Sequence, residues 1–160
     1  MNITFHSPIL ITDKLEELKK FYIEQLGLEI DMDFGPCVSL KCGLSLWQLS
    51  PEHKIAKKLG RQYYKDGNKN FELSFETDDF ENVVMELRKY NPVLLHDVEL
   101  ETWGQKTIRF FDPENNLIEI GETLPGFVKR MYKEEKSVDE IVEITSIDKN
   151  MVLEIIGLEQ

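Results

Sequence analysis

The sequence has few cysteines and no long hydrophobic run. Cys37 and Cys42 are the only cysteines among 160 residues, and with no Cys or His cluster beside them they predict neither a disulfide framework nor a zinc site. No stretch approaches the ~20 consecutive apolar residues that a membrane-spanning helix needs. The first residues also lack the basic and apolar regions of a secretory signal. We therefore expect a cytoplasmic protein with no membrane partner.

Basic residues are also scarce relative to acidic ones. The chain has 19 Lys and Arg against 30 Asp and Glu, which gives a formal net charge of -11. So acidic a chain is repelled by phosphate backbones, so nucleic acid is not expected as a partner. Hydrophobic residues make up 41% of the chain, enough for an ordinary buried core. The length fits one domain, or one domain with an appendage.

The first third of the chain predicts a strand, a helix and three further strands. Residues 3–11 are β-prone, and Thr12 and Asp13 then offer helix N-caps. Leu15, Leu18 and Phe21 follow at helical spacing, up to a stop at Gly27. Three short β-like runs come next, at residues 28–34, 38–42 and 44–49. Residues 51–69 predict an irregular loop that contains a short helix at 52–58.

The same order of elements then starts again. Residues 70–77 predict a strand, and a helix follows with Phe80, Val84 and Leu87 on one face. Three more β-like runs occupy residues 93–98, 106–111 and 117–120. The sequence thus predicts an α+β fold of two paired βαβββ modules, residues 3–50 and 70–122, within one domain spanning 3–122. A whole-unit repeat of this kind buries each unit's face against the other.

The repeat can be aligned residue by residue. His6 falls on Glu72, and Gln48 falls on Glu119. The offset grows from 66 to 71 residues between these two anchors, which predicts five extra residues in the loops of the second copy.

Residues 124–160 form a helical C-terminal appendage of different composition. Ser137 and Glu140 make a capping box, and two runs of apolar residues follow it. A helix–turn–helix outline of this kind is also found in DNA-binding proteins. The segment carries five basic and eight acidic residues, so packing or homodimerisation is favoured over contact with phosphates.

Three segments resemble the glyoxalase/bleomycin-resistance/extradiol-dioxygenase (vicinal oxygen chelate) superfamily. Residues 21–28 (FYIEQLGL) resemble its FYxxxLGL segment, and residues 72–79 (ELSFETDD) are similar to the opening of its second module. Residues 109–119 (RFFDPENNLIE) resemble its RFxDPxGNxxE ending. The resemblance covers about residues 3–122. It specifies the fold well and the reaction poorly, because one fold hosts many functions.

The resemblance implies a divalent metal ion held by the first and last strands of each module. Carried over, these ligand positions are His6, Gln48, Glu72 and Glu119. Such a mixed N/O set suits Ni²⁺, Mn²⁺, Co²⁺, Fe²⁺ or Zn²⁺, and two carboxylates that share a cavity need a cation or a proton between them. The second module has Glu72 where metal enzymes of the superfamily usually have histidine. No organic cofactor is indicated.

The resemblance also implies a chemistry, in which the metal chelates two adjacent oxygens of a small molecule and stabilises an enediolate-like charge. Glu119 or Glu72 would be the catalytic base of such an isomerase or lyase, as in lactoylglutathione lyase. Arg109 would neutralise an anionic substrate, and Trp47 and Trp103 would line the substrate cavity. Tryptophans of this kind also serve simply as core residues.

Two other functions remain open. One is a metal-free small-molecule binder of the bleomycin-resistance kind, in which the four candidate ligands do not converge. In that case Glu72 and Glu119 line a solvated cleft, Gln48 is an ordinary polar strand residue and His6 is a packed or exposed histidine. The other is a scaffold or regulatory protein that acts through its helical tail. His53 and His96 are expected to be solvated in every case.

Overall fold

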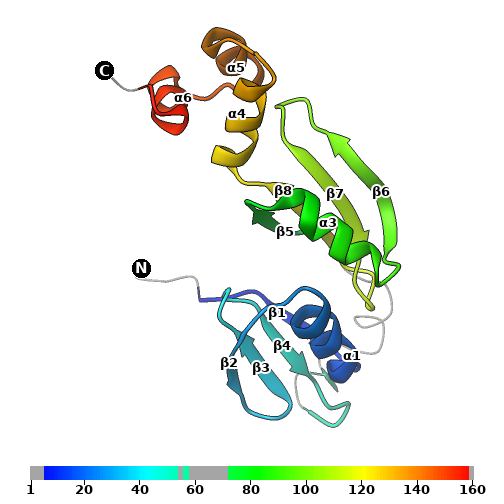
Figure 1. The fold of residues 1–160 in the computed structure, drawn as a ribbon. Coiled ribbons are helices and arrows are strands. Elements are labelled where there is room, and N and C mark those ends of the chain that lie inside the picture. The colour runs from blue at the N-terminus through cyan, green and yellow to red at the C-terminus, as the bar shows by residue number, and fades with distance from the viewer. Residues whose placement is uncertain (1–5, 54–55, 58–71, 159–160) are drawn as a thin grey trace. The chain divides into compact units, whose positions relative to one another are not determined.

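The computed structural model describes residues 6–53, 56–57 and 72–158 (Figure 1). The chain forms two four-stranded sheets with helices, followed by a set of C-terminal helices. The predicted α+β fold with two βαβββ modules and a helical extension is confirmed. The contacts divide the chain into unit 1 (residues 1–71 and 111–116) and unit 2 (residues 72–110 and 117–160).

Unit 1 contains the first module. Its elements are β1 (Ile9–Thr12), α1 (Leu15–Lys19), η1 (Lys20–Gln25), β2 (Ile30–Asp33), β3 (Cys37–Leu40) and β4 (Ser45–Gln48). The sheet order is β1-β4-β3-β2, with β1 parallel to β4. The predicted strand at 3–11 and the predicted short helix at 52–58 fall partly outside the described residues.

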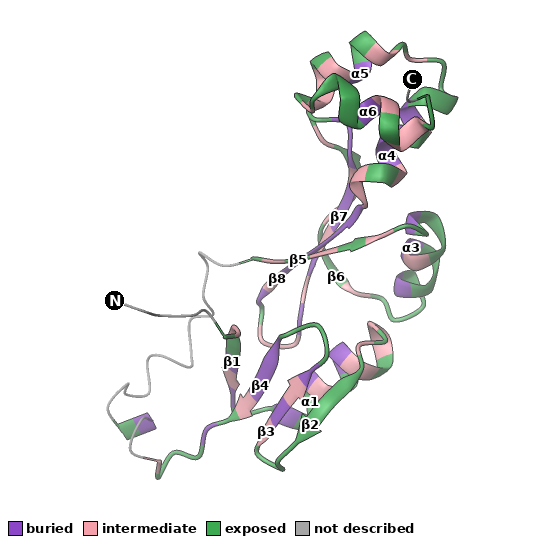
Figure 2. Ribbon diagram, turned by 90° about the vertical axis from the view of Figure 1, so that its left-hand side faces the viewer, coloured by how far each residue is buried: buried purple, intermediate pink, exposed green. Residues whose placement is uncertain are grey.

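The predicted first helix is divided into an α-helical and a π-helical part. In η1 the amide of Leu26 donates to the carbonyl of Phe21, five residues back, at 3.0 Å, which is the π-helical spacing. Gly27 then ends the helix with φ +68°, a conformation that costs glycine little. Alternate residues of β1 and β3 are buried, as are residues of the helix, which the colouring of Figure 2 marks along the ribbon. The buried apolar residues of this core include Leu10, Leu15, Leu18, Phe21, Tyr22, Val38, Leu40 and Leu46.

Unit 2 repeats this arrangement. Its elements are β5 (Glu72–Thr77), α3 (Phe80–Arg88), β6 (Val93–Leu100), β7 (Lys106–Phe111) and β8 (Leu117–Glu122). The sheet order is β5-β8-β7-β6, with β5 parallel to β8, the same topology as in unit 1. The buried apolar residues of this sheet and helix are Phe80, Val84, Leu87, Ile108, Phe110, Ile118 and Ile120.

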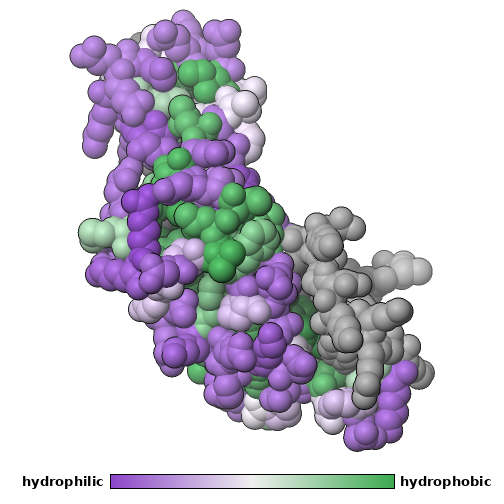
Figure 3. Space-filling view, turned by 90° about the vertical axis from the view of Figure 1, so that its right-hand side faces the viewer, coloured by the Kyte–Doolittle hydropathy of each residue, from purple (hydrophilic) through white to green (hydrophobic). Residues whose placement is uncertain are grey.

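Strand β6 forms an edge of the unit 2 sheet and exposes hydrophobic side chains. Val93, Leu95 and Leu100 are more than half exposed. Figure 3, which views the molecule from the β6 side, shows hydrophobic surface on this unit. The opposite edge of the sheet is β5, whose exposed positions are occupied by Glu72, Ser74 and Glu76.

Three C-terminal helices extend unit 2. They are α4 (Leu124–Lys133), α5 (Val138–Thr145) and α6 (Lys149–Ile156). Ser137 and Glu140 form the predicted capping box, and Gly157 ends α6 with φ +74°. The helices share a core of Phe127, Val128, Met131, Ile141 and Val152. Among the described residues, no helix is both long and apolar enough to cross a membrane.

The turn between β7 and β8 and the last residue of β7 belong to unit 1, although the rest of both strands belongs to unit 2. Asp112 organises this turn, accepting hydrogen bonds from the amides of Glu114 at 2.9 Å and Asn116 at 2.8 Å. Its other oxygen accepts from the hydroxyl of Tyr22 at 2.8 Å. Tyr22 is fully buried, and burial, followed by the neighbouring Asp112, raises the pKa of its phenol. The hairpin turn is therefore anchored to the first module's helix.

For a second residue of the turn, Glu114, we expect a substitution to stabilise the protein in a pH-dependent way. Burial raises the pKa of Glu114, as do Asp13 and Asp112, although a hydrogen bond from Thr12 at 3.0 Å opposes the shift. A raised folded-state pKa means that Glu114 favours folding least when it is ionised. Glu114→Gln should therefore raise the free energy of unfolding at pH 7. The gain should vanish near pH ~4, where the glutamate is itself protonated.

Urea denaturation at pH 7 and pH 4 measures this difference. Glu24→Gln is the matched control, since Glu24 is exposed on η1 and has no ion-pair partner among the described residues. An equal effect of the two variants at pH 7 would show that burial of Glu114 has no electrostatic cost.

Candidate functional site

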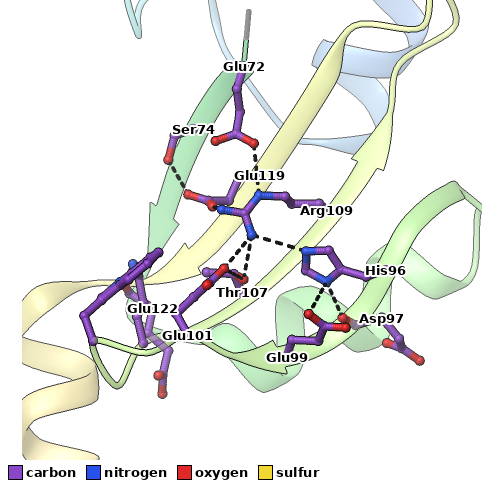
Figure 4. Close-up of polar contacts among 12 residues, drawn as sticks. Glu72, Ser74, His96, Asp97, Glu99, Glu101, Thr107, Arg109, Glu119 and Glu122 are labelled. Carbon is purple, nitrogen blue, oxygen red and sulfur yellow. Dashed lines mark hydrogen bonds and ion pairs between the residues drawn. The ribbon is translucent and has the colours of Figure 1, made fainter. Parts of the chain in front are cut away.

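Arg109 on β7 is the centre of a charged cluster on the open face of the unit 2 sheet (Figure 4). Its Nε lies 3.0 Å from Glu72 Oε2 of β5, and its Nη1 lies 2.5 Å from Glu101 Oε1, just after β6. Its Nη2 pairs with Glu119 of β8. One guanidinium thus binds three carboxylates from three different segments.

Hydroxyl groups hold two of these carboxylates in place. Ser74 lies directly opposite Glu119 in the β5–β8 pairing, and its hydroxyl donates to Glu119 Oε1 at 2.8 Å. The Thr107 hydroxyl donates to Glu101 Oε1 at 2.9 Å. These bonds fix the orientation of the carboxylates independently of Arg109.

His96 of β6 completes the cluster. Its Nε2 lies 3.2 Å from Arg109 Nη1, and its Nδ1 lies 2.7 Å from the carbonyl of Asp97. A guanidinium has only donors, so Nε2 is the acceptor and the proton is assigned to Nδ1. This arrangement corresponds to a neutral imidazole. Glu99 lies 3.8 Å from Nδ1 and would pair with the imidazolium if the ring were protonated.

The cluster carries an excess of negative charge. Three carboxylates surround one guanidinium, so two negative charges remain when His96 is neutral. Arg109 holds the pKa of Glu101 below its usual range through its hydrogen bond, against the opposing effect of burial. Burial lowers the pKa of Arg109, but its bonds to Glu101 and Glu72 outweigh that effect and raise it. Glu101 and Arg109 therefore stay ionised at neutral pH.

Glu72, Glu119 and Arg109, which the sequence singled out, do come together. The guanidinium is the cation shared by the two carboxylates, so their mutual repulsion is already relieved. The pairing leaves Arg109 engaged by the protein's own acids, and its expected role toward an anionic substrate stays a prediction.

Gln48 lies on the face of the unit 1 sheet that carries the buried side chain of Leu46. Residues two apart on a strand share a face, so Gln48 points to the same side as Leu46, which is fully buried opposite Val38. Glu119 points to the open side of its sheet, together with Ser74. The strand alternation therefore does not reproduce the equivalence between Gln48 and Glu119 that the sequence spacing predicts.

His6 is exposed and precedes β1 in unit 1. In chemistry the four predicted donors suit a divalent ion; His6 and Gln48 belong to unit 1, and Glu72 and Glu119 belong to unit 2. Glu72 and Glu119 share Arg109, and Gln48 is exposed at the end of β4. In the part of the chain that the structure describes, no group of three or more His, Cys, Asp or Glu could hold a metal ion.

The two tryptophans occupy different units. Trp47 lies on the face of its strand opposite Leu46, and its ring meets that of His53 edge-on, with centroids 5.4 Å apart. Trp103 is 42% exposed in the turn between β6 and β7. Its indole Nε1 donates to Gln105 Oε1 at 2.9 Å. Trp103 thus belongs to the same turn as Glu101.

Sequence reasoning missed Glu101, Ser74 and His96. The expectation that His96 is solvated is wrong, because only 17% of its side chain is exposed and it contacts Arg109. A weak signal existed in the two-residue alternation of β6, which places His96 on one face with Leu94 and Val98. The sequence did not show that Arg109 lies on that same side of the sheet.

Comparison with known proteins gives a consistent result. Residues 5–125 match the model of the glyoxalase-like domain. A protein of unknown function from Agrobacterium tumefaciens str. C58 is 30% identical with a TM-score of 0.69, over 78% of this chain and 97% of that one. No curated protein matches the chain.

Two other solved structures share the fold at lower identity. A lactoylglutathione lyase from Agrobacterium tumefaciens is 21% identical with a TM-score of 0.53, over 75% of this chain and 93% of that one. A member of the glyoxalase/bleomycin resistance protein/dioxygenase superfamily from Sphaerobacter thermophilus DSM 20745 is 22% identical with a TM-score of 0.54, over 75% and 98%.

Proposed function

This chain belongs to the glyoxalase-like domain family, and we propose that it binds a small cationic molecule at the Arg109 cluster without requiring a metal ion. The observation that carries the proposal is the convergence of three glutamates on one guanidinium, which leaves two negative charges in excess. The residues that would bind the ligand are Glu72 and Glu119, which lie on neighbouring strands, and Glu101, which lies beside them.

The burial of the cluster makes this excess charge effective. Only 10% of the Glu119 side chain and 20% of the Glu101 side chain are exposed, so water and salt screen them less than ordinary surface carboxylates. A ligand with amine or guanidine groups would gain charge-assisted hydrogen bonds there. An anionic ligand would be repelled, since Arg109 has no uncompensated charge to offer it.

The proposal is tested by calorimetric titration of the full chain with bleomycin, a cationic glycopeptide, at low and high salt. We expect one molecule bound per chain, with affinity that falls as salt rises. Glu119→Gln should weaken binding. Glu76→Gln is the matched control, since Glu76 is exposed on β5 and its side chain forms no ion pair or hydrogen bond with the described residues.

Equal affinities of the Glu119→Gln and Glu76→Gln variants would place the binding elsewhere on the chain. A complete absence of heat with bleomycin and with simple diamines would contradict the proposal for cationic ligands as a class. Preference for a carboxylate or phosphate compound would contradict its charge argument.

The second candidate is metal-dependent isomerase or lyase chemistry on a molecule with adjacent oxygens. The same excess of negative charge favours it, because a divalent ion would neutralise the cluster. Such an ion would have to compete with Arg109 for Glu72 and Glu119. Titration of chelator-treated protein with Ni²⁺, Mn²⁺ and Zn²⁺ distinguishes the candidates, since one ion per chain, lost in Glu119→Gln, would favour the metal-dependent function.

A further inference from the structure

We infer that the C-terminal helices position the Arg109 cluster, and that Arg130 of α4 is the positioning residue that links them. The inference rests on the proposed function of that cluster. It assigns a role to a segment, residues 126–160, that lies beyond the match to the glyoxalase-like domain. Its basis is one short turn that α4 contacts from one side and Arg109 from the other.

The turn consists of residues 101–105, between β6 and β7. The amide of Glu101 donates to the carbonyl of Gln105 at 2.8 Å, and the amide of Gly104 donates to the carbonyl of Glu101 at 2.9 Å. Gln105 Nε2 donates to the carbonyl of Glu122 at 2.7 Å. The turn is therefore a closed, internally bonded loop that is also tied to the end of β8.

Arg130 binds this loop and the end of β8 together. Its Nη2 donates to the Gly104 carbonyl at 2.6 Å and to Glu122 Oε2 at 2.8 Å, and its Nε donates to Glu122 Oε1 at 2.7 Å. Glu122 in turn accepts from the amide of Lys106 at 2.9 Å. The bidentate pair is largely buried, with 18% of Arg130 and 9% of Glu122 exposed, so its geometry is rigid.

Close packing reinforces this contact. Gly104 has φ +91°, and a Cβ at this position would lie 2.9 Å from the sulfur of Met131 and 3.1 Å from a methyl carbon of Ile144. The turn is thus pressed against side chains of both α4 and α5. A side chain at position 104 would push the helices away from the turn.

Glu101 transmits the position of the turn to the cluster. Its backbone closes the loop that Arg130 holds, and its carboxylate binds Arg109 Nη1 at 2.5 Å and the Thr107 hydroxyl at 2.9 Å. Movement of Gly104 therefore moves the acid that orients the guanidinium. Because Arg130 touches none of the cluster's carboxylates, it acts through the turn.

The test is a ¹³C-detected titration of the Glu101 carboxyl group in the full chain. The wild-type group should titrate below the ordinary glutamate pKa because of its bond to Arg109. In Arg130→Gln the titration midpoint should rise toward the ordinary value. Lys129→Gln, which removes an equal charge from the exposed face of the same helix, should leave the midpoint unchanged.

Arg130→Lys is the second variant, for use if Arg130→Gln does not fold. Lysine keeps the charge but lacks the planar fork that spans Glu122 and the Gly104 carbonyl, so the midpoint should again rise. A wild-type midpoint in a folded Arg130 variant would overturn the inference. A shifted midpoint in a chain that binds no bleomycin would instead retain the coupling and count against the proposed function.

Discussion

Replacing Arg109 with glutamine should lower the free energy of unfolding by about 2–4 kcal/mol at pH 7. The substitution removes charge-assisted hydrogen bonds to Glu72, Glu101 and Glu119, and it leaves three carboxylates close together without a cation. This loss lies below the full cost of breaking a buried ion pair, because 19% of the Arg109 side chain is exposed to solvent. Urea denaturation of both proteins measures the difference.

The loss should shrink as the pH falls. The folded-state pKa of Glu101 is depressed, so its stabilising contribution is complete above the unfolded pKa of ~4.3 and disappears as the pH drops through the folded value. In Arg109→Gln that contribution is absent, and protonation of the crowded carboxylates relieves their repulsion. The two proteins should therefore approach each other in stability between pH 5 and about pH 3.

Arg88→Gln is the control for Arg109→Gln. Arg88 also forms an ion pair, with Asp97 at 2.7 Å, but both side chains are more than half exposed. Exposed pairs contribute about 0–1 kcal/mol, so this variant should lose much less stability. Equal losses of unfolding free energy in the two variants, or a loss for Arg109→Gln that does not vary with pH, would show that the ion pairs of the cluster do not stabilise the fold.

The fold could be predicted from the sequence because it depends on local periodicity and on repetition. The β-like run at residues 106–111 and the helical spacing of Phe80, Val84 and Leu87 correspond to β7 and α3 as observed. The capping box of Ser137 and Glu140 marks the start of α5 correctly. These signals lie within a few residues of the structure that they specify.

The site could be predicted only in part because it depends on which faces of the strands meet. Two residues that match the superfamily's ligand positions, Glu72 and Glu119, do lie together. A spacing of 71 residues superposed Gln48 on Glu119, but an alignment that is wrong by one residue places a side chain on the opposite face of its sheet. The lengths of the loops decide which alignment is correct, and loop sequences have no periodicity that reveals it. The pairing of Glu101 with Arg109 depends on the shape of a turn and has no sequence signature.

Tyr22→Phe should lower the free energy of unfolding by about 1.5–3 kcal/mol, the range for a lost hydrogen bond to a charged group. Tyr22 is fully buried, and its hydroxyl donates to Asp112 Oδ2 at 2.8 Å across 90 residues of sequence. Asp112 is itself only 4% exposed. Phenylalanine fills the same space without the donor, so the variant leaves a buried carboxylate with Asn116 as its remaining side-chain donor.

Hydrogen exchange shows whether this loss is local to the turn. The amides of Glu114 and Asn116 donate to Asp112 Oδ1, so both should exchange faster in Tyr22→Phe if the hydroxyl fixes the carboxylate. Tyr90→Phe is the matched control, because Tyr90 is 49% exposed and its change should stay within about 0.5 kcal/mol. Unchanged protection of both amides, together with a stability loss no larger than in Tyr90→Phe, would mean that the turn holds its place in unit 1 through its own backbone contacts. Faster exchange confined to these amides would instead identify Tyr22 as the anchor that keeps the β7–β8 turn within unit 1.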